Sequence, residues 1–392
     1  MEYKKVIENF FKENFNKKFF SNHSPFLTNL ETSEVKKCLK TTFVSTAGKY
    51  QDLFVKKISK ILKTNYIIPL NSGTSALHIA MILSKLGKDD EVLMPSLTFV
   101  ATANSAVYVG ASPHFVDICK KTLTIDFEKL ESHVKKFKFK NGHLYNHKSK
   151  KKIKALVLVH TYGFAGMVDQ AKKFCKKYNL IFIEDAAESL ASFYNNKHTG
   201  TFGDFGCLSF NGNKVITTGA GGLLITKKKS DYLKGLLFSD VGKKKIPNVF
   251  DFSDIGYNYK MPSLNAALGC GQLKNLNKIM KLKFKLHNLY KNYFRLNKKI
   301  IFYTDSKKLK QKSNYWLNTI FIDDARFTEK HQKNLLISLN KININLRPTW
   351  KPLHTLRHLK HYSKSDLSTT NYIKYRLFNL PSSPDIILYE KK

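Results

Sequence analysis

The sequence has few cysteines and no long apolar run. Its 392 residues include five cysteines, Cys38, Cys119, Cys175, Cys207 and Cys270, and no two of them form a C-x-x-C motif. An odd number of scattered cysteines is typical of a reducing compartment and excludes a disulfide framework or a zinc cluster, so we predict no metal site. No apolar run reaches the roughly 20 residues that a membrane-spanning helix needs. The charged first segment does not resemble a signal peptide. We expect a cytoplasmic protein with no membrane partner.

Acidic residues are also scarce. The chain has 29 Asp and Glu against 67 Lys and Arg, which gives a formal charge of +38. A basic field of this size would attract nucleic acid or an anionic membrane. Lysines nevertheless occur in nearly every segment, and dense runs such as 148–154 lie in expected loops rather than along one helix. The pattern favours a solvated coat, with no nucleic-acid partner, although a non-enzymatic basic binding protein remains an alternative.

Short apolar runs alternate with helix-length segments. The runs begin at Tyr66, Glu91, His114, Ala155, Leu180, Cys207 and Gly221. This alternation predicts an α/β fold, with a mainly parallel, seven-stranded sheet in a three-layer large domain. A long helical pattern begins at Met261 and Pro262, before a lysine-rich region with weaker strand signals. We predict an N-terminal extension (1–24), a large domain (25–255) and a smaller C-terminal α+β domain that includes the long linking helix (256–392).

A glycine-containing turn follows the first predicted strand. The segment LNSGTSALHIA places Gly73, Thr74 and Ser75 at the start of a predicted helix. Backbone N–H groups at a helix N-terminus lack partners within the helix, so these groups, the helix dipole and two hydroxyls favour an anion such as phosphate. An ordinary N-cap with a turn glycine explains the same residues.

Charged and aromatic residues follow later strands. The segment LIFIEDAAES places Glu184 and Asp185 at a strand end, on the sheet edge where α/β proteins bind ligands. Asp185 would either cap a helix or raise the pKa of a heterocyclic nitrogen and hold it protonated. Lys214 lies between Ser209 and the turn TTGAGG, and Phe99 follows another strand. A phosphate cradle, a carboxylate, an aromatic face and a lysine are the groups that pyridoxal 5'-phosphate needs.

Several motifs occur in a specific order. They are NSGTSALHIA, MPSLTFVATANSAVYVGASPHFVDI, EDAAES, SFNGNK, GAGG and GYNYKMPSLNAALG. In order and spacing they resemble the nucleotide-sugar aminotransferases of the DegT/StrS-like family, which are pyridoxal-phosphate enzymes of fold type I in the aspartate aminotransferase superfamily. The similarity extends from about residue 24 to residue 384. No single motif is decisive, but the ordered set is specific.

The resemblance implies roles for individual residues. Lys214 would carry the cofactor and act as acid and base, and Asp185 would contact the pyridine nitrogen. The implied cofactor-binding set is Gly73, Thr74, Ser75, Phe99, Asp185, Glu188, Ser209, Asn213, Lys214 and Asn258. Asn258 would reach the phosphate of the neighbouring subunit, which implies a homodimer. Candidate substrate residues are His160, Lys260, Arg347, Trp350 and His354, although His160 alone is more often a core histidine and the last three also fit a packing loop.

The resemblance also implies a reaction. Glutamate would donate its amino group, giving pyridoxamine 5'-phosphate, and the nitrogen would pass to a nucleotide-linked 4-keto-6-deoxyhexose. The start of the chain, the segment 141–152 and NLRPTWKPLHTL most resemble the branch that makes 4-amino-4,6-dideoxyhexoses for bacillosamine- and legionaminic-type surface sugars. The implied acceptor is a UDP- or GDP-linked N-acetylhexosamine.

Some positions depart from the commoner family pattern. Glu188 stands where many relatives have His or Gln, Lys260 where Arg is frequent, and Ala220 where an acidic residue is frequent. Lysine keeps the charge of arginine but lacks its bidentate fork, which weakens the expectation that Lys260 binds phosphate or substrate. Related sugar dehydratases have histidine at the position of Lys214. The lysine in this chain therefore favours transamination. A dehydratase or epimerase with the same cofactor remains an alternative.

Overall fold

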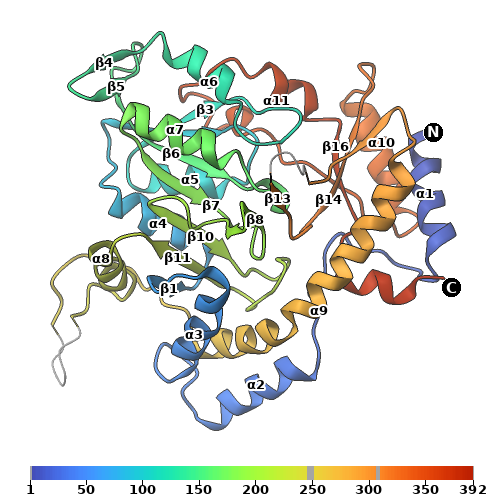
Figure 1. The fold of residues 1–392 in the computed structure, drawn as a ribbon, viewed down its shortest axis with the longest axis horizontal. Helices are drawn as coiled ribbons and strands as arrows, with labels where there is room; N and C mark the ends of the chain where they lie inside the picture. Colours follow the sequence, from blue (N-terminus) through green and yellow to red (C-terminus); the bar gives the residue numbers. More distant parts are fainter. Residues whose placement is uncertain (1, 245–250, 306–309, 392) are drawn as a thin grey trace.

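A long helix joins two units of the molecule. The computed structural model describes residues 2–244, 251–305 and 310–391. Helix α9 (Ser263–Phe294) runs from beneath a large sheet to a smaller C-terminal unit (Figure 1). Pro262 stands at its N-cap, where a missing N–H costs nothing, as the sequence predicts for this helix start. Among the described helices, none is long and apolar enough to cross a membrane.

The large sheet contains all seven predicted strands. In spatial order they are β1 (Ile67–Leu70), β11 (Gly222–Thr226), β10 (Phe205–Ser209), β7 (Ile181–Asp185), β6 (Lys152–Val159), β2 (Asp90–Pro95) and β3 (Ser112–Val116). Neighbours from β10 to β3 are parallel, and β11 is antiparallel to both β10 and β1. The mainly parallel sheet is therefore confirmed. The hairpin of β4 (Lys138–Lys140) and β5 (His143–Tyr145) pairs with β6 and brings the sheet to nine strands, two more than predicted.

Helices cover both faces of this sheet. Val92 and Met94 face one apolar cluster while Leu93 faces another, as the alternation of side chains along a strand requires. One face packs against α4 (Gly73–Leu83), α5 (Ala101–Tyr108) and α8 (Lys229–Ser239). The other packs against α3 (Tyr50–Leu62), α6 (Phe127–Val134), α7 (Val168–Tyr178) and α9. Because both faces are buried, the strands are almost continuously apolar in sequence.

The C-terminal unit is built on a second sheet. Its strands lie in the order β12 (Ile300–Phe302), β14 (Asn318–Ile322), β16 (Leu377–Leu380) and β15 (Arg347–Pro348), and neighbouring strands are antiparallel. Further elements are α2 (Asn29–Lys40), α10 (Glu329–Asn340), α11 (Ser368–Ile373), the short helices η1 (Thr161–Gly163), η2 (Leu353–Thr355) and η3 (Pro384–Tyr389), and the strands β8 (Phe193–Tyr194), β9 (Lys197–His198) and β13 (Gln311–Lys312).

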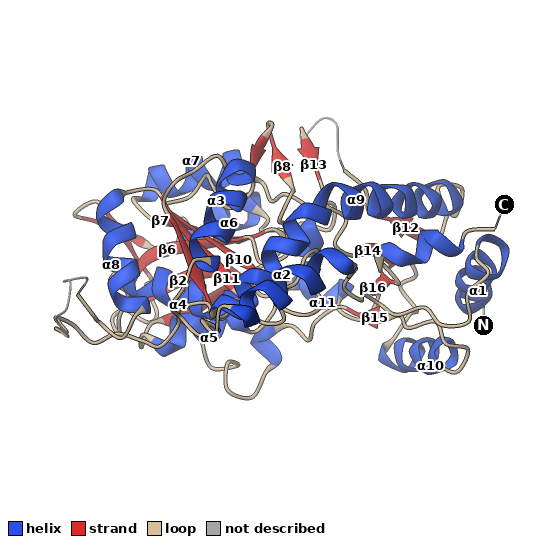
Figure 2. Ribbon diagram, turned by 90° about the horizontal axis from the view of Figure 1, so that it is seen from below, coloured by secondary structure: helices blue, strands red, loops and turns tan. Residues whose placement is uncertain are grey.

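The first helix belongs to the core of the C-terminal unit. Helix α1 (Glu2–Asn14) buries Ile7, Phe10 and Phe11 in one cluster with Tyr290 of α9 and Phe378 of β16. The rings of Phe10 and Tyr290 stack with centroids 4.4 Å apart. Figure 2 shows α1 near the C-terminus, at the end of the molecule remote from the large sheet. The segment predicted as an extension therefore packs against residues near the other end of the chain.

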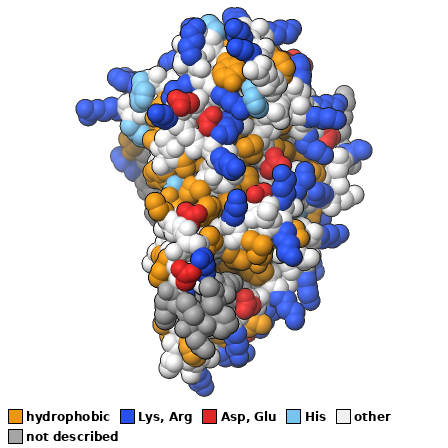
Figure 3. Space-filling model, turned by 90° about the vertical axis from the view of Figure 1, so that its left-hand side faces the viewer, with side chains coloured by type: hydrophobic (Ala, Val, Ile, Leu, Met, Phe, Trp, Pro, Cys, Tyr) orange, Lys and Arg blue, Asp and Glu red, His pale blue; other side chains and the backbone are white. Residues whose placement is uncertain are grey.

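The basic side chains on one face of the molecule are not gathered into a patch (Figure 3). On the face shown in Figure 3, Lys and Arg are scattered between apolar and uncharged groups and do not gather into a single stripe. This distribution agrees with a solvated coat.

Candidate active site

A pocket of about 410 Å³ opens at the carboxyl edge of the large sheet. It is lined by Val159, Asp185 and Ser209, which are the last residues of β6, β7 and β10, and by Thr98 and Phe99, which follow β2. The carboxyl ends of parallel strands meet at one edge, where open α/β sheets bind ligands. The topology thus brings together residues from four distant segments.

The N-terminus of α4 forms one side of the pocket. Ser72 caps the helix, and its Oγ accepts a hydrogen bond from the Ser75 N–H at 3.0 Å. Gly73 leaves no room for a side chain, because a Cβ there would lie 2.8 Å from the Cβ of Ser209. Gly73, Thr74 and Ser209 line the pocket, whereas Ser75 does not, and its hydroxyl donates to Asn71 Oδ1 at 2.6 Å. The turn therefore presents helix N–H groups and hydroxyls to an anion.

Asp185 forms the floor of the pocket. Its Oδ2 accepts a hydrogen bond from Thr102 Oγ1 at 2.7 Å, and its Oδ1 accepts one from the Ala187 N–H at 3.2 Å. Burial raises the pKa of Asp185, and these hydrogen bonds and the charge of Lys214 oppose that rise. A buried carboxyl group of this kind is stabilised as the anion when a cation binds beside it.

Lys214 lies above this floor, between a carboxyl group and an aromatic ring. Its Nζ is 3.5 Å from Glu188 Oε1 and 4.0 Å from the centroid of the Trp316 ring. The pKa of Glu188 is raised to about 7. Burial raises it, and the charge of Lys214 and a hydrogen bond from the Tyr162 N–H offset only part of that rise. The amine is therefore held in a fixed, largely desolvated position.

Two aromatic or cationic residues of the predicted substrate set also line this pocket. Arg347 and Trp350 come from the C-terminal unit, and Trp350 stacks on Tyr162 with ring centroids 4.7 Å apart. Asn213 and Glu188 line the pocket as well. Two of the predicted substrate residues therefore meet most of the predicted cofactor residues where the two units adjoin.

Other predicted site residues lie outside the pocket of a single chain. His160 is buried: its Nδ1 accepts from the Gly166 N–H at 2.9 Å, so its Nε2 carries the proton and donates to Glu184 Oε1 at 3.0 Å. Burial alone would raise the pKa of Glu184, but His160 and backbone N–H groups outweigh it and lower that pKa. His160 thus orders the strand end that carries Asp185.

The remaining predicted site residues outside the pocket are Lys260, Asn258 and His354. Lys260 Nζ forms an ion pair with Asp240 Oδ2 at 3.1 Å, and Asn258 is exposed on the same segment. His354 Nδ1 is 2.7 Å from Ser96 Oγ. None of the three lines the pocket.

Trp316 and Thr102 were not predicted from the sequence. Trp316 precedes β14 and lines the pocket, and Thr102 holds Asp185 from below. One signal for Trp316 is its rarity, because the chain has two tryptophans and both line this pocket. Nothing in the sequence around Thr102 separates it from other helical threonines.

The residues present fit pyridoxal 5'-phosphate. The close approach of Gly73 to Ser209 leaves a cradle of N–H and hydroxyl groups for a phosphate. Asp185 offers a buried carboxyl group for a ring nitrogen, and Lys214 an amine for an aldehyde. Phe99 and Ala187 line the space between them.

Comparison with known proteins agrees with this geometry. Residues 25–390 match the model of the DegT/DnrJ/EryC1/StrS aminotransferase family. A GDP-perosamine synthase of Escherichia coli is 32% identical over 94% of both chains. A UDP-4-amino-4,6-dideoxy-N-acetyl-beta-L-altrosamine transaminase of Campylobacter jejuni is 31% identical over 79% of this chain and 78% of its own. Helicobacter pylori PseC, an aminotransferase involved in the biosynthesis of pseudoaminic acid, superposes with a TM-score of 0.82 at 27% identity over 93% of this chain and 94% of its own.

The chain belongs to the DegT/DnrJ/EryC1/StrS aminotransferase family. The predicted family, the fold type I architecture, the aminotransferase class and the pyridoxal-phosphate cofactor are confirmed. The roles of the individual site residues and the domain boundaries stay predictions.

Proposed function

We propose that this family member moves an amino group from glutamate to the C4 keto carbon of a nucleotide-linked 4-keto-6-deoxyhexose. The observation that carries the proposal is the meeting of Lys214, Asp185 and the α4 N-terminus in one pocket. Two relatives support a nucleotide-sugar substrate: one is named for GDP-perosamine and the other for a UDP-linked 4-amino-4,6-dideoxy sugar. The product class is an amino sugar for polysaccharide synthesis, and we assign it to the legionaminic and bacillosamine type.

Each pocket residue has a defined task in this proposal. Pyridoxal phosphate, when bound, supplies the electron sink that makes proton loss at an amino-bearing carbon possible. Asp185 holds a proton on the ring nitrogen, and the α4 N-terminus and Ser209 hold the phosphate. Lys214 Nζ takes and returns the proton at the reacting carbon, a role that needs a fixed amine free of bulk water. Glu188, 3.5 Å from that Nζ, stabilises its ammonium form.

One wall of the pocket is formed by residues of the C-terminal unit, namely Trp316, Arg347 and Trp350, and we assign the binding of the nucleotide sugar to this wall. Arg347 is exposed at its mouth and offers five N–H donors that suit a diphosphate or a carboxylate. Trp316 and Trp350 offer flat apolar faces against which a sugar ring or a base packs. The same wall therefore serves both glutamate and the nucleotide sugar, which use the pocket in turn.

The products of the reaction test this proposal directly. Purified protein is given glutamate and a panel of UDP- and GDP-linked 4-keto-6-deoxyhexoses, and the products are identified by mass spectrometry. We expect a 4-amino sugar and one equivalent of 2-oxoglutarate, and neither from Lys214→Ala. A dehydrated or epimerised sugar formed without glutamate would support the alternative enzyme class. Tight, salt-sensitive binding of nucleic acid with no sugar product would support a binding protein.

We further propose that the active form is a homodimer. Exposed apolar side chains, including Tyr108, Val241, Phe252 and Ile255, accompany the exposed Asn258 on neighbouring segments of the large unit. A monomer rarely exposes many large apolar groups close together. In the dimer, Asn258 of one subunit would contribute to the phosphate site of the other.

Subunit mixing tests the shared site. Lys214→Ala and Asn258→Ala are each expected to be inactive or impaired as homodimers. A mixed dimer carries both changes in one of its two sites and neither change in the other, so mixing should restore up to about a quarter of wild-type activity per total subunit, because half of the dimers are mixed. Absence of any restoration in a mixture that is shown to exchange subunits would contradict the proposal.

We also propose that the enzyme works in the cytoplasm, in two domains divided near residue 255. All five cysteines are free, which suits a reducing compartment. Limited proteolysis of the purified protein, with the fragments identified by mass spectrometry, tests the domain boundary, and fractionation of the source cells tests the compartment.

A further inference from the structure

A second buried lysine lies close to the pocket and takes no part in the chemistry described above. Lys283, on α9, is 1% exposed. Its Nζ donates to the carbonyl oxygens of Trp316 at 3.1 Å and Ser382 at 2.9 Å, and it lies 3.1 Å from His23 Nε2. Burial lowers the pKa of Lys283 to about 7. In its ammonium form the group has three N–H donors and no acceptor, so these three contacts satisfy it completely. Burial and the nearby charges of Lys283 and Lys214 lower the pKa of His23 well below its usual value, which leaves a neutral imidazole as the third acceptor.

We call Lys283 with its three partners, His23, Trp316 and Ser382, the Lys283 clamp. It ties helix α9 to three segments that are distant in sequence. A buried polar group is costly unless it is hydrogen-bonded, and removal of one partner leaves the others unsatisfied. The clamp therefore holds the backbone of Trp316 in a single position relative to α9.

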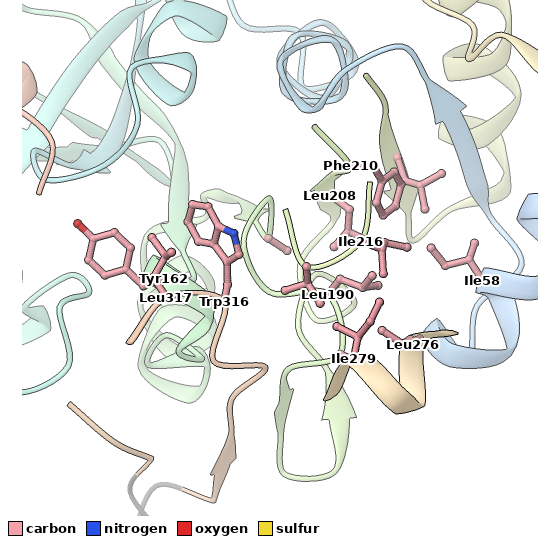
Figure 4. Packing of buried hydrophobic residues seen from close by; sticks show 14 of the residues in the cluster. Ile58, Tyr162, Leu190, Leu208, Phe210, Ile216, Leu276, Ile279, Trp316 and Leu317 are labelled. Atoms are coloured by element: carbon pink, nitrogen blue, oxygen red, sulfur yellow. The ribbon is translucent and has the colours of Figure 1, made fainter. Parts of the chain in front are cut away.

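The side chain of Trp316 is fixed at its other end as well. Its Nε1 donates to the Asn213 carbonyl oxygen at 2.7 Å, and its ring centroid is 4.0 Å from Lys214 Nζ. Figure 4 shows the ring among the buried apolar side chains that include Tyr162, Leu190 and Leu317. A cation over an aromatic face is stabilised most when water is excluded, and this stabilisation depends on where the ring lies. The ring thus links the clamp to the reactive lysine.

We propose that Lys283 is a positioning residue for the active site, acting through the ring of Trp316 to place the amine of Lys214. The inference rests on the proposed role of Lys214. A clamp with a purely architectural role would stabilise the fold without affecting the pocket. The two roles differ in what Trp316 and Lys214 experience when the clamp is removed.

The first experiment follows Trp316 by fluorescence and needs no substrate or cofactor. Trp350→Phe leaves Trp316 as the single tryptophan of the chain. In this background Lys283→Met keeps the apolar stem and removes the amine with its three contacts. We expect a shifted emission maximum and about a twofold rise in quenching by acrylamide, because the wall opens locally.

Two matched variants separate positioning from stability. Tyr290→Phe, also on α9, removes the hydrogen bond from Tyr290 Oη to the Pro381 carbonyl oxygen, next to the Ser382 contact, but leaves Trp316 untouched. Lys281→Met removes an exposed lysine from the same helix. Neither should change the fluorescence of Trp316. Equal changes in Lys283→Met and Tyr290→Phe at matched melting temperature would overturn the proposal.

The second experiment is a double-mutant cycle on cofactor binding. We expect Lys283→Met to weaken pyridoxal-phosphate binding about tenfold, as measured by absorbance titration of the folded apoprotein. In the Trp316→Leu background we expect Lys283→Met to weaken binding by no more than about threefold, because the ring that transmits the effect is gone. Additive effects would overturn the proposal, as would unaltered binding in a folded Lys283→Met protein. Failure to aminate any sugar would instead count against the proposed function and leave these two measurements intact.

Discussion

The two sides of the pocket differ in origin and in surroundings. The sheet-edge side, with Asp185, Ser209 and Lys214, comes from strand ends of one parallel sheet, and its charged groups are buried and paired. The wall side, with Arg347 and Trp350, comes from strand β15 of the C-terminal unit and the loop that follows it, and Arg347 is exposed. Buried, fixed groups suit proton transfer, whereas groups in contact with solvent suit the exchange of two substrates. We therefore expect changes on the sheet-edge side to lower kcat and changes on the wall side to raise KM.

Loss of the Lys214 amine should have the largest effect. Lys214→Ala removes the group that takes and returns the proton, so we expect kcat to fall by at least about a thousandfold. Mass spectrometry of the borohydride-treated wild type should find the cofactor mass on the Lys214 peptide and nowhere else. Turnover close to wild type in Lys214→Ala would remove the basis for the division between the two sides.

Asp185→Asn keeps the shape of the floor and removes its charge. An amide cannot stabilise a proton on the ring nitrogen, so we expect kcat to fall about a hundredfold with little change in KM. The exposed Asp89→Asn serves as the control. A rise in KM with unaltered kcat would place Asp185 with the wall rather than with the sheet edge.

Glu188 gives the sheet-edge side a pH signature in the apoprotein. Burial raises its pKa from 4.5 to about 7. The native state keeps this proton to higher pH than the unfolded chain does. The contribution of protonated Glu188 to the free energy of unfolding is therefore complete below about pH 4.5 and is lost as the pH rises through about 7. Glu188→Gln has no such proton to lose. As the pH rises from 4.5 to 7, we expect its free energy of unfolding to rise by about 2–3 kcal/mol relative to that of the wild type. Urea unfolding of both apoproteins from pH 4.5 to pH 8 measures it, and parallel curves would show that Glu188 does not titrate in this range.

The smallest effect is expected on the wall. Arg347→Met removes a charged donor at the mouth, so KM for the nucleotide sugar or for glutamate should rise about tenfold while kcat stays within about twofold. Arg357→Met, exposed in the same segment, is the matched control. Steady-state kinetics with each substrate varied in turn would reveal which one Arg347 binds. A fall in kcat alone would merge the two sides into one functional unit.

The sequence predicted the large sheet because its strands are buried on both faces. The runs of β6 and β7 are mostly apolar for that reason, so they can be recognised from the local sequence alone. The hairpin of β4 and β5 was missed because Lys138–Lys140 is exposed and has no apolar pattern. Patterns of apolar residues report burial, so an exposed strand escapes them.

The same reasoning explains which site residues could be predicted. Asp185 and Lys214 follow apolar strands, and the edge of a parallel sheet gathers such residues whatever their spacing in the sequence. Trp316 is held at the pocket by the pairing of β14 with β16, by the clamp at Lys283 and by its hydrogen bond to Asn213, which are contacts between distant segments. The role that we propose for Asn258 requires a second subunit, which a single chain cannot display. Long-range packing and assembly are thus the parts that local patterns do not contain.

The burial of α1 in the C-terminal unit sets an order of events during synthesis. Phe10 and Phe11 leave the ribosome before their partners Tyr290 and Phe378, which are made roughly 300 residues later. At about 5–20 residues per second this delay lasts some tens of seconds, during which the apolar face of the helix has no native partner. The nascent chain must therefore keep this face from premature aggregation, by chaperone binding or by temporary docking, until Phe378 has been made.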